Sequence, residues 1–149
     1  MNVKHQYFDS PVHKIGIQAT ENIKKGEVIA YEPVYCFEAS NENTSTTFKN
    51  YLWNGTQFNW SLKGYKFLVS GIGSFANHSD DPNINMSLSQ SEKKNTYAKV
   101  FAIREIKKGE ELFFNYGDNW WKKRPKIAKA SDKPKKRGRP KGSKNKPKK

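Results

Sequence analysis

Aromatic residues and positive charge occupy separate parts of this chain, and that separation limits what can fold. All 20 Phe, Tyr and Trp residues lie at or before Trp121, whereas residues 122–149 hold 15 of the 28 Lys and Arg and a single acid, Asp132. Residues 1–121 therefore balance 13 basic against 13 acidic side chains. Only this first part can bury a core. The sequence predicts one compact domain over residues 1–121 and a disordered, Lys-rich tail over residues 122–149.

The sequence also argues against several classes of protein. Cys36 is the sole cysteine, so no intramolecular disulfide can form, and we expect it to be a small buried apolar residue. No secretory signal and no membrane-spanning apolar run is visible, so an intracellular protein without a membrane partner is predicted. His78, Asp80 and Asp81 come nearest to a metal cluster. No second cluster would complete a coordination shell, so no metal is expected.

Strands dominate the predicted secondary structure, which makes the fold mainly β. Residues 28–39 are rich in β-branched and aromatic side chains, and residues 65–70 form a strand-like run after the turn-led segment 15–19. Residues 97–103 alternate larger side chains with the small apolar Ala98, Val100 and Ala102, which also predicts a strand. Two further segments each place Lys-Lys-Gly-Glu between apolar residues, which predicts two similar glycine turns that lead into strands: residues 23–29 and 106–112. Short helices are expected over residues 46–53 and just after Tyr116, where Asp118 can cap the second one.

The segment from Gly71 to Asn83, GIGSFANHSDDPN, has the composition of a site rather than of a core. Its glycines allow close backbone approach, and Pro82 presets a tight turn. Asn77 and His78 stand side by side as hydrogen-bonding groups. A second motif, EELFFNYG at residues 110–117, follows roughly thirty residues later.

The two motifs together resemble the signature of SET-domain protein lysine methyltransferases, and the resemblance covers residues 3–121. It is closest to the small SET histone methyltransferases of large DNA viruses. It implies a fold of small curved β-sheets with a C-terminal pseudoknot, in which the last segment threads under an earlier loop. It also implies S-adenosylmethionine as the cofactor, S-adenosylhomocysteine as its product and a lysine ε-amine as the methyl acceptor.

The resemblance assigns roles to individual residues. Tyr116 would be catalytic. The cofactor would be bound by Ile15, Gly16, Asn77, His78, Tyr116 and Trp121, with Trp120 as an alternative cover for the adenine. The lysine channel would be lined by Tyr51, Phe114 and Tyr116. Further candidates for its wall, for each of which core packing is the alternative, are Trp53, Phe58, Trp60, Phe75 and Phe113.

The family position of Phe114 bears on the number of methyl groups added. In related enzymes a Phe there tends to permit multiple methylation, because a Tyr hydroxyl would hold a water where the later methyl groups must go. The resemblance therefore implies a di- or trimethyl product.

One position departs from the family pattern. The family usually has Gly-x-Gly near its start, and here Lys14 replaces the first glycine while Gly16 is kept. Gln18 also stands where an aromatic residue is common. A SET module that has lost catalysis is therefore an alternative to an active enzyme.

The tail carries a motif of its own, because residues 135–142, KKRGRPKG, resemble an AT-hook. Gly138 would let the backbone lie at the floor of a DNA minor groove, and Pro140 would keep the strand extended. Arg137 and Arg139 would enter the negative potential of a narrow A·T-rich groove while the lysines contact phosphates. A nuclear localisation signal or a solubilising tail is the alternative.

These features predict a histone lysine methyltransferase held on chromatin by a tail that binds A·T-rich DNA. It would act in the nucleus, a host nucleus if the protein is viral. The alternatives are an architectural DNA-binding protein with an inactive SET module and a methyltransferase for a non-histone protein. Dimerisation stays open, although the closest viral relatives form homodimers.

Overall fold

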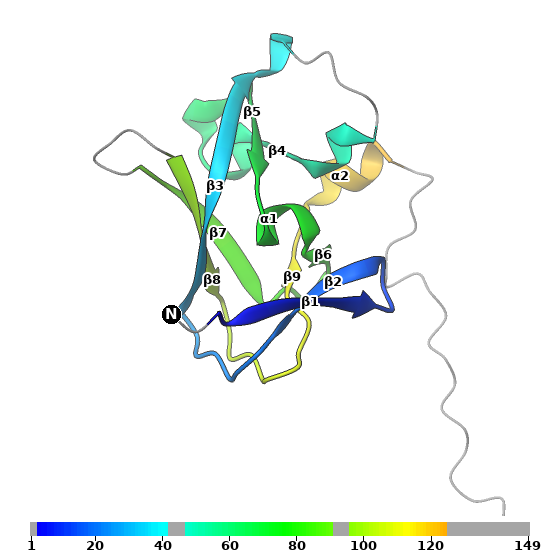
Figure 1. The fold of residues 1–149 in the computed structure, drawn as a ribbon. Coiled ribbons are helices and arrows are strands. Elements are labelled where there is room, and N and C mark those ends of the chain that lie inside the picture. The colour runs from blue at the N-terminus through cyan, green and yellow to red at the C-terminus, as the bar shows by residue number, and fades with distance from the viewer. Residues whose placement is uncertain (1–2, 42–46, 91–95, 125–149) are drawn as a thin grey trace, which may run out of the picture.

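The computed structural model describes residues 3–41, 47–90 and 96–124, and this part of the protein is mainly β (Figure 1). The strands are β1 (His5–Ser10), β2 (Lys14–Ala19), β3 (Val28–Glu38), β4 (Leu52–Asn54), β5 (Tyr65–Val69), β6 (Asn77–His78), β7 (Ile84–Gln90), β8 (Thr96–Ala102) and β9 (Phe113–Phe114). The helices are short: α1 (Ile72–Phe75), α2 (Asp118–Lys122) and the 3-10 turns η1 (Ala39–Asn41), η2 (Phe48–Tyr51), η3 (Gly55–Gln57) and η4 (Trp60–Leu62). The predicted fold class is confirmed.

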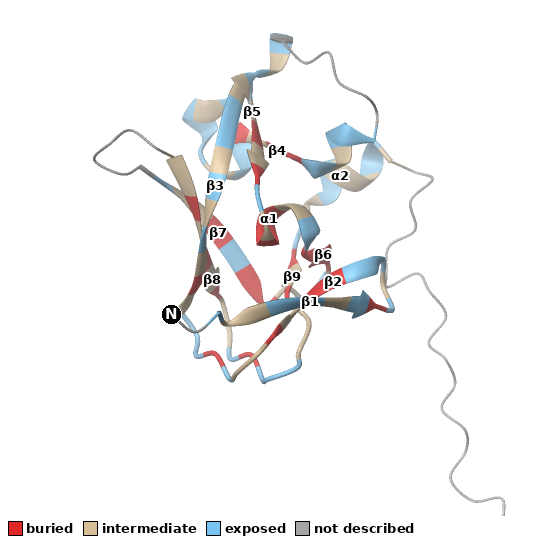
Figure 2. Ribbon diagram, viewed as in Figure 1, coloured by how far each residue is buried: buried red, intermediate tan, exposed pale blue. Residues whose placement is uncertain are grey.

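The main sheet is antiparallel and has the strand order β4-β5-β3-β8-β7. Its longest strand, β3, lies in the middle because its first half pairs with β8 and its second half with β5. In β8 the residues Ala98, Val100 and Ala102 are buried while the alternating residues are half-buried. This matches the predicted alternation and turns one face of the sheet to the core (Figure 2).

The two Lys-Lys-Gly-Glu segments form similar turns, as predicted. Gly26 and Gly109 have φ of +82° and +81°, which favours glycine. The isoleucine before each turn pairs with its counterpart, because the Ile23 and Ile106 backbones exchange two hydrogen bonds. The sequence repeat therefore builds a contact between the start and the end of the domain.

The C-terminal segment lies between two elements that precede it in the chain. Strand β9 runs parallel to β6, with Asn77 opposite Phe113 and His78 opposite Phe114. On its other side, the N–H of Leu112 donates to the Ile17 carbonyl of β2. This is the arrangement that a pseudoknotted C-terminal segment requires, and it brings both sequence motifs together.

Two sequence predictions are wrong. The helix predicted over residues 46–53 is only the 3-10 turn η2, because Leu52 and Trp53 turn into strand β4 and pair with β5. Cys36 is exposed rather than buried, because it lies on the stretch of β3 that faces outward.

Ordered contacts continue past Trp121. Helix α2 runs through Lys122, and Gly117 rather than Asp118 precedes it as the N-cap. Arg124 donates hydrogen bonds to Asn50 and to the Lys49 carbonyl. Residues 125–149, with the AT-hook-like segment 135–142, lie outside the described residues.

Candidate active site

The Gly71–Asn83 segment is shaped by close contacts that begin at Gly71. Gly71 has φ +52°, and a Cβ there would lie 2.5 Å from both carboxylate oxygens of Glu32. The same carboxylate accepts the Ile72 N–H at the start of α1. Gly73 packs against Val69, which leaves no room for a side chain. This turn sets the direction of the chain as it enters β6.

Asn83 joins the end of this segment to the second motif by hydrogen bonds. It is fully buried, its amide donates to the Glu111 carbonyl at 2.7 Å, and its carbonyl accepts the Phe113 N–H at 2.7 Å. The sequence analysis gave Asn83 no role beyond the turn. Its place after Asp-Pro was the only signal that it could be more than a turn residue.

Asn77 is the centre of a buried polar cluster. Its amide donates to the Glu111 carboxylate at 2.8 Å and to the Ile15 carbonyl at 3.1 Å. The same carboxylate accepts the hydroxyl of buried Ser10 at 2.9 Å. Gly16 lies against this cluster, and a Cβ there would meet Glu111 Oε1 at 2.5 Å. Glycine is required at position 16 because a carboxylate occupies that space.

His78 has both ring nitrogens engaged. Nδ1 accepts the Tyr116 N–H at 3.1 Å, so it carries no hydrogen, and Nε2 lies 3.0 Å from Asp80 Oδ1 and donates to it. The ring also lies 4.8 Å from the Trp121 ring. These contacts make His78 a fixed support for Tyr116 and Trp121 rather than a general base.

Tyr116 is held by contacts from several separate segments of the chain. Its hydroxyl donates to the Ala76 carbonyl at 2.7 Å. Its ring lies 5.9 Å from Trp53, 4.9 Å from Trp120 and 6.3 Å from Trp121. Burial raises the pKa of Tyr116 well above its ordinary value, and Tyr51 and Glu111 add to the rise. The phenol is therefore neutral at physiological pH and acts as a hydrogen-bond donor.

A cavity of about 380 Å³ opens on one side of Tyr116. Of the residues predicted to bind a cofactor, Ile15, Asn77, Tyr116 and Trp121 line it. Gly16 and His78 do not line it but hold those that do. Trp120, the alternative cover for the adenine, lines it too, as do residues that sequence reasoning did not place there: His13, Lys14, Asn50, Tyr51, Ser74 and Phe75.

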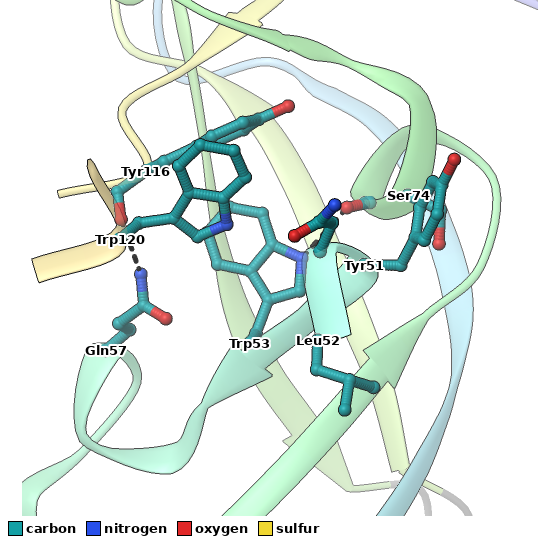
Figure 3. Close-up of a pocket in the computed structure, with 9 residues that line it drawn as sticks. Tyr51, Leu52, Trp53, Gln57, Ser74, Tyr116 and Trp120 are labelled. Carbon is teal, nitrogen blue, oxygen red and sulfur yellow. Dashed lines mark hydrogen bonds between the residues drawn. The ribbon is translucent and has the colours of Figure 1, made fainter. Parts of the chain in front are cut away.

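A second cavity, narrow and of about 20 Å³, lies against Tyr116, Tyr51, Trp53 and Trp120 (Figure 3). Gln57 supports this wall by donating to the Tyr116 carbonyl, and Trp53 Nε1 donates to the Gly73 carbonyl. Five residues line both cavities: Asn50, Tyr51, Ser74, Tyr116 and Trp120. The two spaces therefore adjoin at Tyr116.

The residues predicted to line the lysine channel lie in different places. Tyr51 and Tyr116 line the narrow cavity, whereas Phe114 is buried behind Trp53, 5.2 Å from its ring, and lines neither cavity. Trp60, an alternative candidate, is 74% exposed on η4. The faces of these aromatic residues depend on tertiary packing, which the motif did not specify.

The described ranges contain neither a metal-binding group nor a membrane-spanning helix. No group of three or more His, Cys, Asp and Glu side chains there could hold a metal ion. No helix there is both long and apolar enough to cross a membrane.

The site and the fold match a known family. The SET domain family model matches residues 14–117, well over half of the chain, and the protein belongs to that family. A crystal structure from Plasmodium falciparum, described as a candidate histone methyltransferase, has a TM-score of 0.64 and 29% identity and covers 81% of this chain and 99% of its own. The structure of the Neurospora SET domain protein DIM-5, a histone lysine methyltransferase, has a TM-score of 0.59 and covers 76% of this chain and 52% of its own. At 23% identity its likeness is one of fold alone.

Two curated proteins are similar in sequence. A Schizosaccharomyces pombe protein named histone-lysine N-methyltransferase, H3 lysine-37 specific, is 33% identical over 106 residues, which are 71% of this chain and 68% of that protein. A Caenorhabditis elegans protein named "Probable histone-lysine N-methyltransferase set-23" is 32% identical over 111 residues, 68% of this chain and 45% of that protein. The chain spans less than half of this second relative.

Lys14, which replaces the first glycine of the Gly-x-Gly pattern, has a strained backbone conformation whose cost can be measured. Among the described residues it is the only non-glycine with positive φ, +59°, a conformation that costs an L-residue about 1 kcal/mol. Lys14→Gly should therefore be more stable than Lys14→Ala by about 1 kcal/mol in urea unfolding. At the strand residue Lys99 the order should reverse, because glycine weakens a strand. Equal stability of the two Lys14 variants would show that the backbone at position 14 is not strained.

Proposed function

We propose that this protein is an S-adenosylmethionine-dependent protein-lysine N-methyltransferase that acts on histones. The observation that carries the proposal is the junction at Tyr116 of a ligand-sized cavity and a narrow aromatic one. Such a junction lets two reactants approach one point from different spaces. Holding both in line converts a bimolecular transfer into an effectively unimolecular one.

The residues around the larger cavity fit the proposed cofactor. The aromatic rings of Phe75, Trp120 and Trp121 offer faces for an adenine and for a sulfonium cation. Lys14 brings a cationic side chain to the same cavity, which suits a carboxylate. When bound, S-adenosylmethionine supplies an electrophilic methyl group. The chain itself contributes the position of that ligand.

The narrow cavity has the aromatic walls that a lysine side chain requires, but at about 20 Å³ it has room for about one water molecule, so it would have to widen to admit that side chain. A lysine amine has an ordinary pKa of about 10.4 and must lose its proton before it can attack. Apolar aromatic walls at Trp53 and Trp120 would lower that pKa by desolvation. The neutral Tyr116 hydroxyl donates to the Ala76 carbonyl, which fixes the position of the Tyr116 side chain between the two cavities. No residue has to act as a phenolate base.

Histones are the proposed substrate because the similar proteins from fission yeast and nematode are named for histone-lysine methylation. The same kinship supports the methyltransferase activity, the cofactor and a chromatin location. A non-histone substrate stays the alternative. The di- or trimethyl product that the resemblance implies for Phe114 stays a prediction; in this structure Trp53 and not Phe114 lines the narrow cavity.

Finer features rest on the sequence alone. The Arg-Gly-Arg-Pro run at residues 137–140 supports binding of A·T-rich DNA by the tail, and so a place in the nucleus. The resemblance to small viral SET enzymes supports a viral source and a homodimer.

Replacing the Tyr116 hydroxyl tests the proposed activity. Tyr116→Phe should lower turnover on nucleosomes by on the order of 100-fold, because it removes a polar group from the residue at which the two cavities adjoin and breaks the bond to the Ala76 carbonyl that holds this residue in place. Calorimetry should show nearly unchanged affinity for S-adenosylmethionine. Tyr31→Phe, at an exposed residue, is the matched control and should behave as wild type. Failure of the wild-type protein to bind S-adenosylmethionine would refute the proposed methyltransferase activity.

Replacing the two tail arginines tests DNA binding. In the full chain, Arg137→Ala with Arg139→Ala should abolish the preference for A·T-rich over G·C-rich duplex in a competition assay. The control removes the same charge elsewhere in the tail, Lys144→Ala with Lys146→Ala, and should keep the preference while weakening both affinities equally. A wild-type chain that binds the two duplexes equally would reduce the tail to a nonspecific polycation.

A further inference from the structure

A third cavity, of about 300 Å³, adjoins the narrow one and has a basic lining. The two cavities share Asn50, Leu52 and Trp120. Four side chains in the lining of this third cavity, named here the basic cavity, are cationic: Lys49, Lys66, Lys123 and Arg124. No Asp or Glu of the described chain lines it.

This concentration of charge is made by folding. Lys49 comes from η2, Lys66 from β5, and Lys123 with Arg124 from the end of α2. Lys49 and Lys66 come from residues 1–121, which are neutral as a whole, and the fold puts them beside Lys123 and Arg124 from the start of the basic stretch that follows. The potential of such a hollow favours an anionic ligand.

Arg124 is held in a fixed orientation. Its guanidinium donates to Asn50 Oδ1, to the Trp120 carbonyl at 3.2 Å and to the Lys49 carbonyl at 2.8 Å, and it lies 4.4 Å from the centre of the Trp120 ring. Among the described residues these bonds use three of its five N–H groups. A pre-oriented guanidinium with N–H groups to spare suits a carboxylate or a phosphate.

We propose that the basic cavity recognises a negatively charged side chain next to the target lysine, either Asp or Glu or a phosphorylated Ser or Thr. This inference rests on the proposed function, because it requires a lysine in the narrow cavity. A shared wall puts the two side chains of the substrate close together, and an extended chain advances about 3.3 Å per residue. The charged residue would thus lie within about three positions of the lysine.

The geometry favours a peptide over DNA in this cavity. A hollow of about 300 Å³ accepts one side chain of an extended segment, whereas a duplex presents its phosphates on a convex surface. The inference restricts the proposed substrates to segments that carry an acidic or phosphorylated residue near the target lysine. A uniformly basic histone segment would be repelled, and an acidic or phosphorylated one would be bound.

Peptide methylation by the full chain tests the proposal. Histone peptides that hold one lysine are compared with copies in which each neighbour within three positions is Glu, Gln, Ser or phosphoserine. For the wild type, Glu over Gln and phosphoserine over Ser should each raise kcat/KM roughly 10-fold at one or two positions, the size expected for a charge-assisted hydrogen bond. Lys66→Gln with Lys123→Gln should bring both ratios close to one.

The control variant removes the same charge on the two glycine turns, Lys25→Gln with Lys108→Gln, and should keep the ratios. Equal rates for Glu and Gln peptides at every position in the wild type would overturn the inference and leave the proposed function standing. Ratios that survive in the Lys66 and Lys123 variant, with weaker binding of duplex DNA, would assign the cavity to DNA and also overturn it. No methylation of any peptide or of nucleosomes would refute the proposed function itself.

Discussion

The hydrogen bond from the Asn77 amide to the Glu111 carboxylate joins the two motifs on which the site depends. Its partners lie 34 positions apart, and the same carboxylate also holds Ser10 of β1. A hydrogen bond to a charged acceptor is worth about 1.5–3 kcal/mol, and leaving a buried partner unsatisfied costs a similar amount. Gly16 follows from this bond, since any side chain there would displace the carboxylate.

Once this cluster is closed, the aromatic wall has a fixed place. The parallel pairing of β6 with β9 delivers Tyr116 to His78, which accepts its N–H and packs against Trp121. The Tyr116 ring then separates a roomy cavity from a narrow one. Desolvation keeps its phenol neutral, so the site works by holding reactants in place rather than by exchanging protons with this tyrosine.

Much of this site could be predicted from the sequence, because its central residues sit in short motifs. Asn77, His78 and Tyr116 act within a few residues of a turn or a strand end, and their neighbours specify what they do. The glycine turns and the alternation in β8 were also visible, since they depend on local backbone preferences and on period two.

The rest depends on contacts between distant segments. Trp53 lines the narrow cavity and Phe114 lies behind it. Trp53 has this place because β4 pairs with β5. The face of β3 that carries Cys36 is likewise set by packing against other strands, and Asn83 gains its partners only when the second motif folds back. The basic cavity gathers three separate segments, so no local pattern could reveal it.

The central claim is that the cofactor and the lysine meet at Tyr116 from two different cavities. A crystal structure of the full chain with S-adenosylhomocysteine and a lysine peptide tests it most directly. The account predicts the thioether sulfur beside Tyr116, with the cofactor product among Ile15, Asn77 and Trp121 and the lysine amine between Trp53 and Tyr116. A product bound outside that cavity, or a lysine entering from the same side as the product, would contradict it.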